Sequence, residues 1–209
     1  MKKIFSAVII LLLCNTANAQ TKVILKIGGN KSTAKVVDSS IEEKHHYVTG
    51  FSAGVTLDVP FEGALHFTPS IGYSRRGYAF SQVTGPIRKT KNTIHYIDLT
   101  PGATLNFSIS KNKKSAVILG LGPTLSTAIS GTEKNTFASD SVATNKMVFS
   151  YTVYSRIDVG LTASISVKLN KFLLESSCFF GLANTENDES LLRNIQSRTF
   201  SVSIGYYLR

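Results

Sequence analysis

The stretch Val153–Val167, VYSRIDVGLTASISV, decides the fold of this chain. Successive residues of a β-strand point to opposite sides. One side of this stretch therefore carries Val153, Ser155, Ile157, Val159, Leu161, Ala163, Ile165 and Val167, and the other carries Tyr154, Arg156, Asp158, Gly160, Thr162, Ser164 and Ser166. The first face is almost wholly apolar, whereas the second is small and polar and includes an arginine and an aspartate. The direction in which the apolar face points separates a soluble barrel from a membrane barrel.

Residues 1–19 predict a secretory signal peptide. A basic pair, KK, precedes the apolar run IFSAVIILLL, and ANA at positions 17–19 provides a small-x-small cleavage site. The apolar run is about half of the ~20 residues that a membrane-spanning helix needs. We therefore expect the mature protein, residues 20–209, to leave the cytoplasm.

The mature chain is basic. Removal of the signal peptide lowers the formal net charge from +10 to about +8. A basic exported protein suits acidic polysaccharide or lipid phosphates as partners. The sequence contains no basic helical stripe or recognition helix, so we expect no nucleic-acid partner. Cys178 is the one cysteine after cleavage, which excludes an intrachain disulfide.

Eight segments show the two-residue alternation of strands. Several exceed the ~5–6 residues usual in globular proteins and match the ~9–11 residues of a tilted transmembrane strand. The connections alternate between short and long, as in an up-and-down barrel. The predicted fold is all-β: a closed, antiparallel, up-and-down transmembrane β-barrel of eight strands, with both termini at the short-turn, periplasmic rim. The strands are Lys22–Asn30, Val48–Val59, Ala64–Phe80, Thr93–Ile109, Ser115–Ile129, Met147–Val167, Lys171–Ala183 and Arg198–Leu208.

The composition of the two faces indicates which one meets lipid. The polar face is rich in Ser, Thr and Gly and poor in Lys and Glu, which suits the crowded interior of a narrow barrel. Aromatic residues of the apolar face gather near the strand ends, as expected at membrane interfaces: Phe67, Phe107, Phe172 and Tyr206 near the turns, and Phe51, Tyr73, Phe149, Tyr151 and Phe200 near the loops. We therefore expect the apolar face to point outward. Pro69, Pro101 and Pro123 lie within strands, where each removes a ladder donor, so bulges or locally widened pairing are expected there.

This pattern resembles the outer-membrane β-barrel (porin-family) domain of Gram-negative bacteria. The resemblance lies in LKIGGN, GFSAGVTLDVPF, PSIGYSRRGY, IHYIDLTPGATLNF, VILGLGPTLS and the final FSVSIGYYLR, and it covers essentially the whole mature chain. It implies location in the cell outer membrane and insertion by the barrel-assembly machinery. It is specific for the fold and weak for function. Such barrels often end on an aromatic residue, whereas this chain ends Tyr206-Tyr207-Leu208-Arg209.

Charged residues on the inward face form the first candidate site. Buried charges are tolerated only when they are paired, and an eight-stranded barrel has room inside for little more than its own side chains. We therefore predict a lumenal network of paired charges that fills the barrel. Its members are Lys26, Asp58, Arg76, Asp98, Arg156, Asp158 and Glu175.

Basic residues near the loops form the second candidate site. Arg88, Lys89 and Lys91, with Arg75 near the same rim, would face lipopolysaccharide phosphates outside the cell. The alternative is a solvated loop. The expected partners are outer-membrane lipid, lipopolysaccharide, and an extracellular protein or host ligand, and we expect a monomer.

Three other functions are open from the sequence. The charged lumen could conduct ions or small solutes. His95 precedes Asp98 and serines are plentiful, so a membrane-embedded lipid hydrolase is conceivable, but no signature identifies a nucleophile. His45 and His46, near Glu42 and Glu43, could bind a metal, but their spacing fixes no coordination geometry. We favour a structural or interaction protein that is not an enzyme and has no cofactor or metal.

Overall fold

The structure, a computed structural model, describes residues 21–37, 43–82, 86–109, 114–149, 154–185 and 194–208. The predicted signal peptide lies outside the described residues. Within them there is no helix capable of crossing a bilayer. The ten strands are β1 (Lys22–Val37), β2 (Glu43–His46), β3 (Val48–Glu62), β4 (Leu65–Gln82), β5 (Ile87–Ser108), β6 (Ser115–Phe137), β7 (Val142–Lys146), β8 (Ile157–Leu169), β9 (Phe172–Gly181) and β10 (Asn194–Tyr207).

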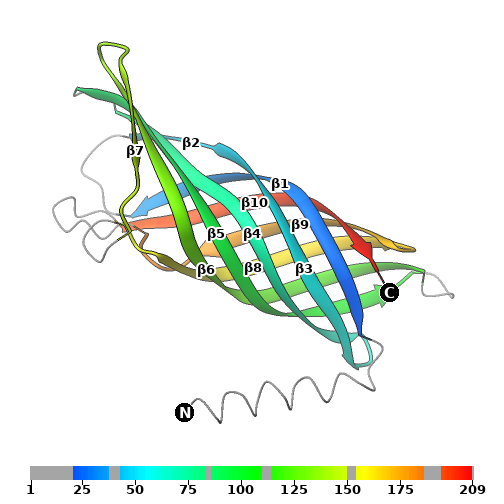
Figure 1. Cartoon of the computed structure of the whole chain (residues 1–209). Coiled ribbons are helices and arrows are strands. Elements are labelled where there is room, and N and C mark those ends of the chain that lie inside the picture. The colour runs from blue at the N-terminus through cyan, green and yellow to red at the C-terminus, as the bar shows by residue number, and fades with distance from the viewer. Residues whose placement is uncertain are drawn as a thin grey trace, which may run out of the picture.

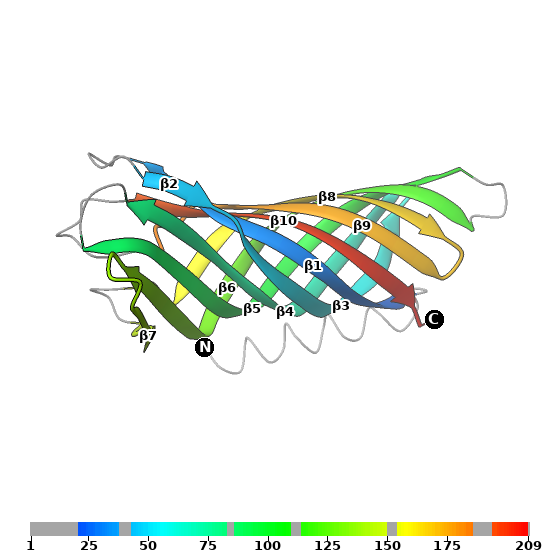
Figure 2. The ribbon, with the colours of Figure 1, turned by 90° about the horizontal axis from the view of Figure 1, so that it is seen from above.

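Eight of these strands close into a ring. Each of β1, β3, β4, β5, β6, β8, β9 and β10 pairs antiparallel with its neighbour in that order, and β10 pairs with β1. Figures 1 and 2 show the tilted strands wrapping around one axis. The short strands β2 and β7 pair with β4 and β6 beyond this ring. The predicted eight-stranded up-and-down barrel is confirmed.

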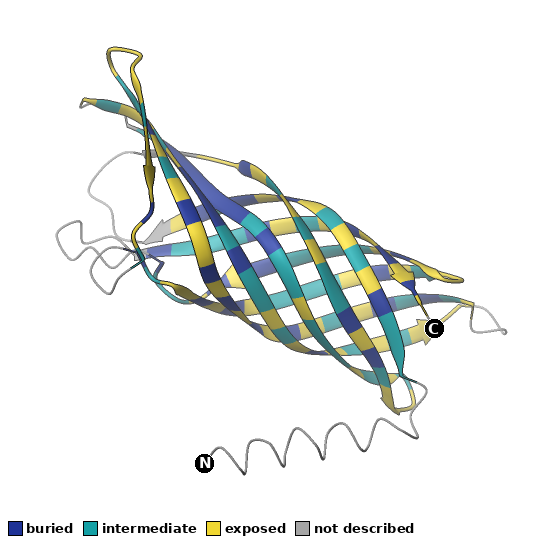
Figure 3. Ribbon diagram, in the orientation of Figure 1, coloured by how far each residue is buried: buried dark blue, intermediate teal, exposed yellow. Residues whose placement is uncertain are grey.

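The apolar face of the strands is the outside of the barrel. In β8 the apolar set of the opening stretch is exposed from Ile157 to Val167, Ile165 at 53%, whereas Asp158 is 1% exposed and Ser166 is buried. Exposed and buried residues alternate in the same way on the other strands, which gives the checkered pattern in Figure 3. The outside is made of leucine, isoleucine, valine and phenylalanine, so lipid is the solvent that this surface fits.

The three strand prolines interrupt the pairing without shifting its register. Ladder pairs are missing between Thr56–Ser70 and Val59–Phe67, beside Pro69, and between Leu99–Leu125 and Ala103–Leu121, beside Pro101 and Pro123. The register is the same on both sides of each gap. Bulges occur elsewhere, at Pro60/Glu62, Ile87/Lys89 and His95/Tyr96. Of the two expected solutions, a bulge is not found at these prolines: the ladder is interrupted there and resumes in the same register.

Several strands extend farther at the loop rim than predicted. β1 continues to Val37, β6 to Phe137, and β5 begins at Ile87. Toward this rim the pattern inverts: apolar side chains such as Tyr78 and Ile94 point inward, and in the extension of β5 lysines such as Lys91 point outward. The sequence there reads as polar loop because the exterior has changed from lipid to water.

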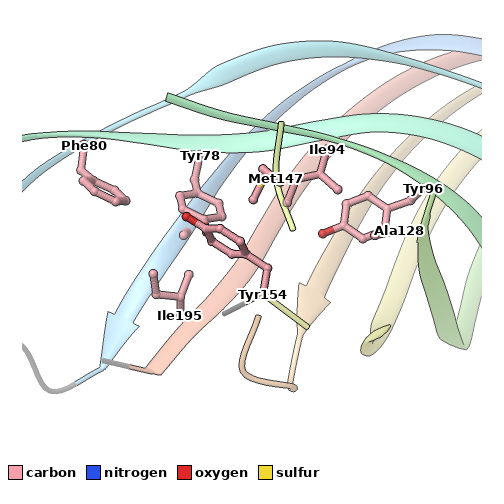
Figure 4. Packing of buried hydrophobic residues seen from close by; sticks show 9 residues of the cluster. Tyr78, Phe80, Ile94, Tyr96, Ala128, Met147, Tyr154 and Ile195 are labelled. Atoms are coloured by element: carbon pink, nitrogen blue, oxygen red, sulfur yellow. The ribbon is translucent and has the colours of Figure 1, made fainter. Parts of the chain in front are cut away.

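The predicted strand Met147–Val167 begins ten residues too early. β8 begins only at Ile157. Met147 and Tyr154 instead join a buried cluster that fills the loop end of the barrel (Figure 4). Phe149, predicted to lie in the loop-side aromatic girdle, packs against this cluster too. The mouth cluster consists of Ala34, Tyr78, Phe80, Ile94, Tyr96, Ala128, Met147, Tyr154 and Ile195.

The closed ring predicts a heat-dependent gel mobility. Backbone hydrogen bonds join every strand of the ring to two neighbours, and breaking them in an apolar environment is costly. Unboiled protein from detergent-extracted outer membranes should therefore migrate as a compact species, and boiling should shift it to the position of the unfolded chain. Identical mobility before and after boiling would contradict the closed ring.

Candidate functional site

The first inward ion pair joins Lys26 of β1 to Glu175 of β9. The Lys26 Nζ lies 3.1 Å from Glu175 Oε1 and 3.3 Å from Oε2. The Ser166 hydroxyl donates to the same carboxylate at 3.4 Å. Both strands place these residues on their inward parity, so the pair spans β10, which lies between β1 and β9, on the inner side of the wall.

The second ion pair lies closer to the loop end, and its cation is more deeply buried than Lys26. Arg76 Nη2 of β4 donates to Asp98 Oδ1 at 2.8 Å and to the Ser126 hydroxyl at 2.7 Å. The guanidinium lies 4.4 Å from the centre of the Tyr96 ring and 4.6 Å from that of Phe179. Ser74 donates to the second oxygen of Asp98 at 2.6 Å. Arg76 thus connects β4, β5 and β6 and lies directly below the mouth cluster.

The remaining predicted members of the network behave differently from one another. Asp58 is buried and its carboxylate contacts the Nδ1 of His66, a partner that the sequence analysis did not include in the network. Asp158 is buried and accepts a hydrogen bond from Ser197. Arg156 is a correction: it precedes β8 and its side chain is exposed, so it lies outside the buried network. The sequence analysis placed Arg156 inside the barrel because it shares the strand parity of Asp158. β8 begins only at Ile157, so that parity does not extend to Arg156.

Cavities lie beside the ion pairs. Two cavities of about 110 and 150 Å³ share Lys26 and Glu175 in their walls, and Arg76 and Asp98 line the larger one. A chain of threonine hydroxyls crosses the interior from Thr100 through Thr124 to Thr162, at 2.9 and 2.6 Å. The walls suit ordered water, which would satisfy buried polar atoms without a partner in the structure, such as the amide of Asn30.

Both ends of this polar interior carry apolar side chains. The mouth cluster occupies the loop end, where the Tyr154 hydroxyl donates to Glu133 at 2.6 Å. Gly131 leaves room for the mouth cluster, since a Cβ at this position would lie 2.7 Å from the Met147 sulfur. A second cluster, Ile24, Ala116, Ile118, Leu173 and Tyr207, lies at the turn end. The arrangement is that of a filled barrel.

The predicted loop cations lie on strands. Arg88, Lys89 and Lys91 belong to the extension of β5, and Arg75 belongs to β4. Arg88 pairs with Asp140 at 3.4 Å, and both side chains are largely exposed. Lys89 and Lys91 are exposed on the outward parity of β5, and Arg75 is half-buried on the outward parity of β4. The structure therefore brings Arg75, Lys89 and Lys91 to one outer wall.

Further cations that the sequence analysis missed lie on the same outer parity. Those of β1 and β6 were hidden because their segments read as loop, and continuing the strand alternation into the polar segments would have found them. Arg198 begins a predicted strand and was not considered as part of a site. We call the whole set the cationic collar: Lys31 and Lys35 of β1, Arg75 of β4, Lys89 and Lys91 of β5, Lys134 of β6 and Arg198 of β10. Lys91 and Lys134 are directly opposite each other in the β5–β6 ladder. Like charges in that position repel, so an anion between them would relieve the strain.

His95 does not form a catalytic site with Asp98. On β5 they have opposite parity: Asp98 binds Arg76 inside the barrel, whereas His95 lies on the outer wall and its Nδ1 bonds the Tyr73 hydroxyl. The predicted metal cluster cannot be followed, because Glu42 and the side chains of Glu43 and His45 lie outside the described residues. Among the residues that are described, no three His, Cys, Asp or Glu side chains gather as a metal site would require.

Comparisons with solved structures find small outer-membrane proteins at low similarity. Ail, the attachment invasion locus protein of Yersinia pestis, is 14% identical with a TM-score of 0.43, over 90% of this chain and 98% of Ail. Neisserial surface protein A is 15% identical with a TM-score of 0.45, over 88% of this chain and 96% of that protein. A search of curated proteins finds no match.

The family comparison covers most of the chain. The sequence pattern of the outer membrane protein beta-barrel domain matches residues 18–187, which include β1 to β9 of the ring. The exposed apolar wall and the closed ring described above are the features that a membrane-spanning barrel requires. The chain belongs to the family of outer membrane protein beta-barrel domains, and it is a protein of the outer membrane.

Proposed function

We propose that this protein is a structural or interaction barrel whose cationic collar binds phosphate groups of lipopolysaccharide at the outer surface. The loops above the collar would then be presented to an extracellular protein or host ligand. Insertion by the barrel-assembly machinery and a monomeric state are part of the same proposal. The observation that carries it is the separation of charge between the two sides of the wall.

In the loop half the described carboxylates lie inside the barrel wall or at a loop tip, whereas the collar cations lie outside it. The described carboxylates Asp98, Glu133 and Asp158 point inward, and Asp140 lies at the tip of the β6–β7 connection. The collar cations point outward with no described carboxylate beside them. A cation just beyond the lipid boundary interacts with anionic headgroups by ~1 kcal/mol. The collar therefore supports binding to a polyanionic lipid surface.

The filled interior supports this function over conductance. Arg76 is held by Asp98, Ser126 and two aromatic rings, and the mouth cluster lies above it. An ion entering from the loop end would have to displace apolar side chains and then break a buried ion pair. We propose that the charged residues inside the barrel stabilise it and do not form a path.

Removal of two collar charges should weaken lipid A binding. The variant Lys91→Gln/Lys134→Gln loses about 1 kcal/mol per cation, which corresponds to an affinity on the order of thirtyfold lower. Binding of bisphosphorylated lipid A in neutral detergent micelles, measured by calorimetry, checks this. Lys171→Gln, which removes one exposed charge at the turn rim, is the control and should bind like the wild type. Equal affinity of the double variant and wild type would argue against the collar.

The stability of a single variant, Lys134→Gln, tests the repulsion between Lys91 and Lys134. Lys134→Gln removes one of two opposed like charges, so in neutral detergent without lipid A it should be at least as stable as the wild type. Urea unfolding measures this. A loss of stability would mean that Lys134 already has a favourable partner in the protein.

The ion pair of Arg76 should be a major contributor to stability. Arg76→Gln leaves Asp98 without its cation and removes two cation–π contacts, so unfolding free energy should fall by about 3 kcal/mol. The unfolding free energy can be measured by reversible urea titration of the protein folded in neutral lipid vesicles. The matched control is Arg88→Gln, whose pair with Asp140 is exposed and should contribute nothing measurable. Equal effects of the two variants would contradict a structural role for the buried network.

The wild-type barrel should be silent in planar bilayers. Purified protein should give no discrete current steps, because the mouth cluster and the Arg76–Asp98 pair close the path. Regular single-channel steps whose size changes in Asp98→Asn would establish a conducting lumen instead.

A further inference from the structure

On two neighbouring strands the lipid-facing surface ends at the same paired position. The outward residues of β4 run from Leu65 through Ile71 and Tyr73 to Arg75, the first charged one. Those of β5 run from Phe107 through Leu99 and Ile97 to His95. Arg75 and His95 are direct partners in the β4–β5 ladder. The guanidinium and the imidazole therefore meet at the boundary between the apolar wall and the collar.

Aromatic contacts fix the geometry at this boundary. The Tyr73 hydroxyl bonds His95 Nδ1, and the two rings lie 5.9 Å apart. On the other side, the Phe51 ring of β3 lies 5.5 Å from that of Tyr73. When the Tyr73 hydroxyl donates to Nδ1, the proton of the imidazole is on Nε2, where it can be donated to a ligand.

Arg75 lacks the partners that a half-buried guanidinium usually has. Its Nε is buried and has no hydrogen-bond partner, and none of the ion pairs among the described residues includes Arg75. Arg76, the next residue, shows the contrast, because it is bound by Asp98 and Ser126 inside the barrel. Arginine presents a planar fork of donors that matches the oxygens of a phosphate.

We infer that Phe51, Tyr73, Arg75 and His95 form a discrete site for one lipid phosphate. The phosphate would accept hydrogen bonds from Arg75 and from His95 Nε2. The acyl chains of the same lipid would lie against the exposed side chains Ile71 and Leu99 directly below. A free phosphate ion could use the donors but not the apolar wall, so the proposed ligand is a phosphorylated membrane lipid. This site rests on the proposed function and adds to it a defined stoichiometry and position.

The test compares three probes on the full barrel in neutral detergent micelles. The probes are bisphosphorylated lipid A, the same lipid A with its phosphates removed, and inorganic phosphate. Native mass spectrometry counts the bound lipids, and titration gives their affinity. The site variants are Arg75→Gln and His95→Gln. The control is Arg156→Gln, which removes one cation at the loop rim away from the site. The heat-shift gel verifies that each variant forms a closed barrel.

The site predicts one tightly bound lipid A. Arg75→Gln should weaken that binding about tenfold or more, His95→Gln several-fold, and Arg156→Gln less than twofold. If Arg75→Gln and Arg156→Gln have the same small effect while the collar variant Lys91→Gln/Lys134→Gln still weakens binding, the discrete site is wrong and the collar stands. If wild-type protein binds both forms of lipid A equally, the site and the collar both fail. Inorganic phosphate binding as tightly as lipid A would overturn the assignment to a lipid.

Discussion

The closure of the backbone hydrogen-bond ring is the constraint on which the rest of this structure depends. In lipid no water is present to satisfy an open strand edge, so each spanning strand must pair on both sides. β10 meets β1 over fourteen paired positions, from Val37–Asn194 to Ile24–Tyr207, and this pairing completes the ring. The strand prolines are tolerated because the register continues past them: Pro69 and Pro101 are paired with each other in the β4–β5 ladder.

The solvent outside the ring decides which residues each strand can place there. In the middle of the barrel the outside is lipid and the inside polar, as the alternation of β8 shows. Toward the loop end the outside is water, and the same strands turn apolar side chains inward and lysines outward. The mouth cluster and the cationic collar are consequences of this one change: Tyr78 and Ile94 build the first, and Lys91 and Lys134 belong to the second.

Charge is treated differently on the two sides of the wall. Inside, where desolvation makes an unpaired charge costly, Lys26 and Arg76 each have a carboxylate partner. Outside, at the level of the collar, the described cations lack such partners. An interior of compensated charges favours stability, and an exterior of uncompensated charges favours binding to anions. The structural and lipid-binding role that we propose rests on that difference.

The sequence by itself determined the fold class, the number of ring strands and the direction of the apolar face. Strand parity is a local property that a two-residue period records. For the same reason the sequence also determined which charged residues point inward: Lys26, Asp58, Arg76, Asp98, Asp158 and Glu175. It could not determine where strands end outside lipid, since the alternation inverts there and resembles loop. This is why Lys134 was missed. The opposite error, by which the strand Met147–Val167 was begun too early and Arg156 was placed in the lumen, arose because the two-residue alternation of the sequence continues into the segment before β8. The partners on other strands, such as Glu175 for Lys26 inside the barrel and His95 for Arg75 on the outer wall, were decided only by the tertiary structure. The register between paired strands sets those contacts, and no local pattern encodes it.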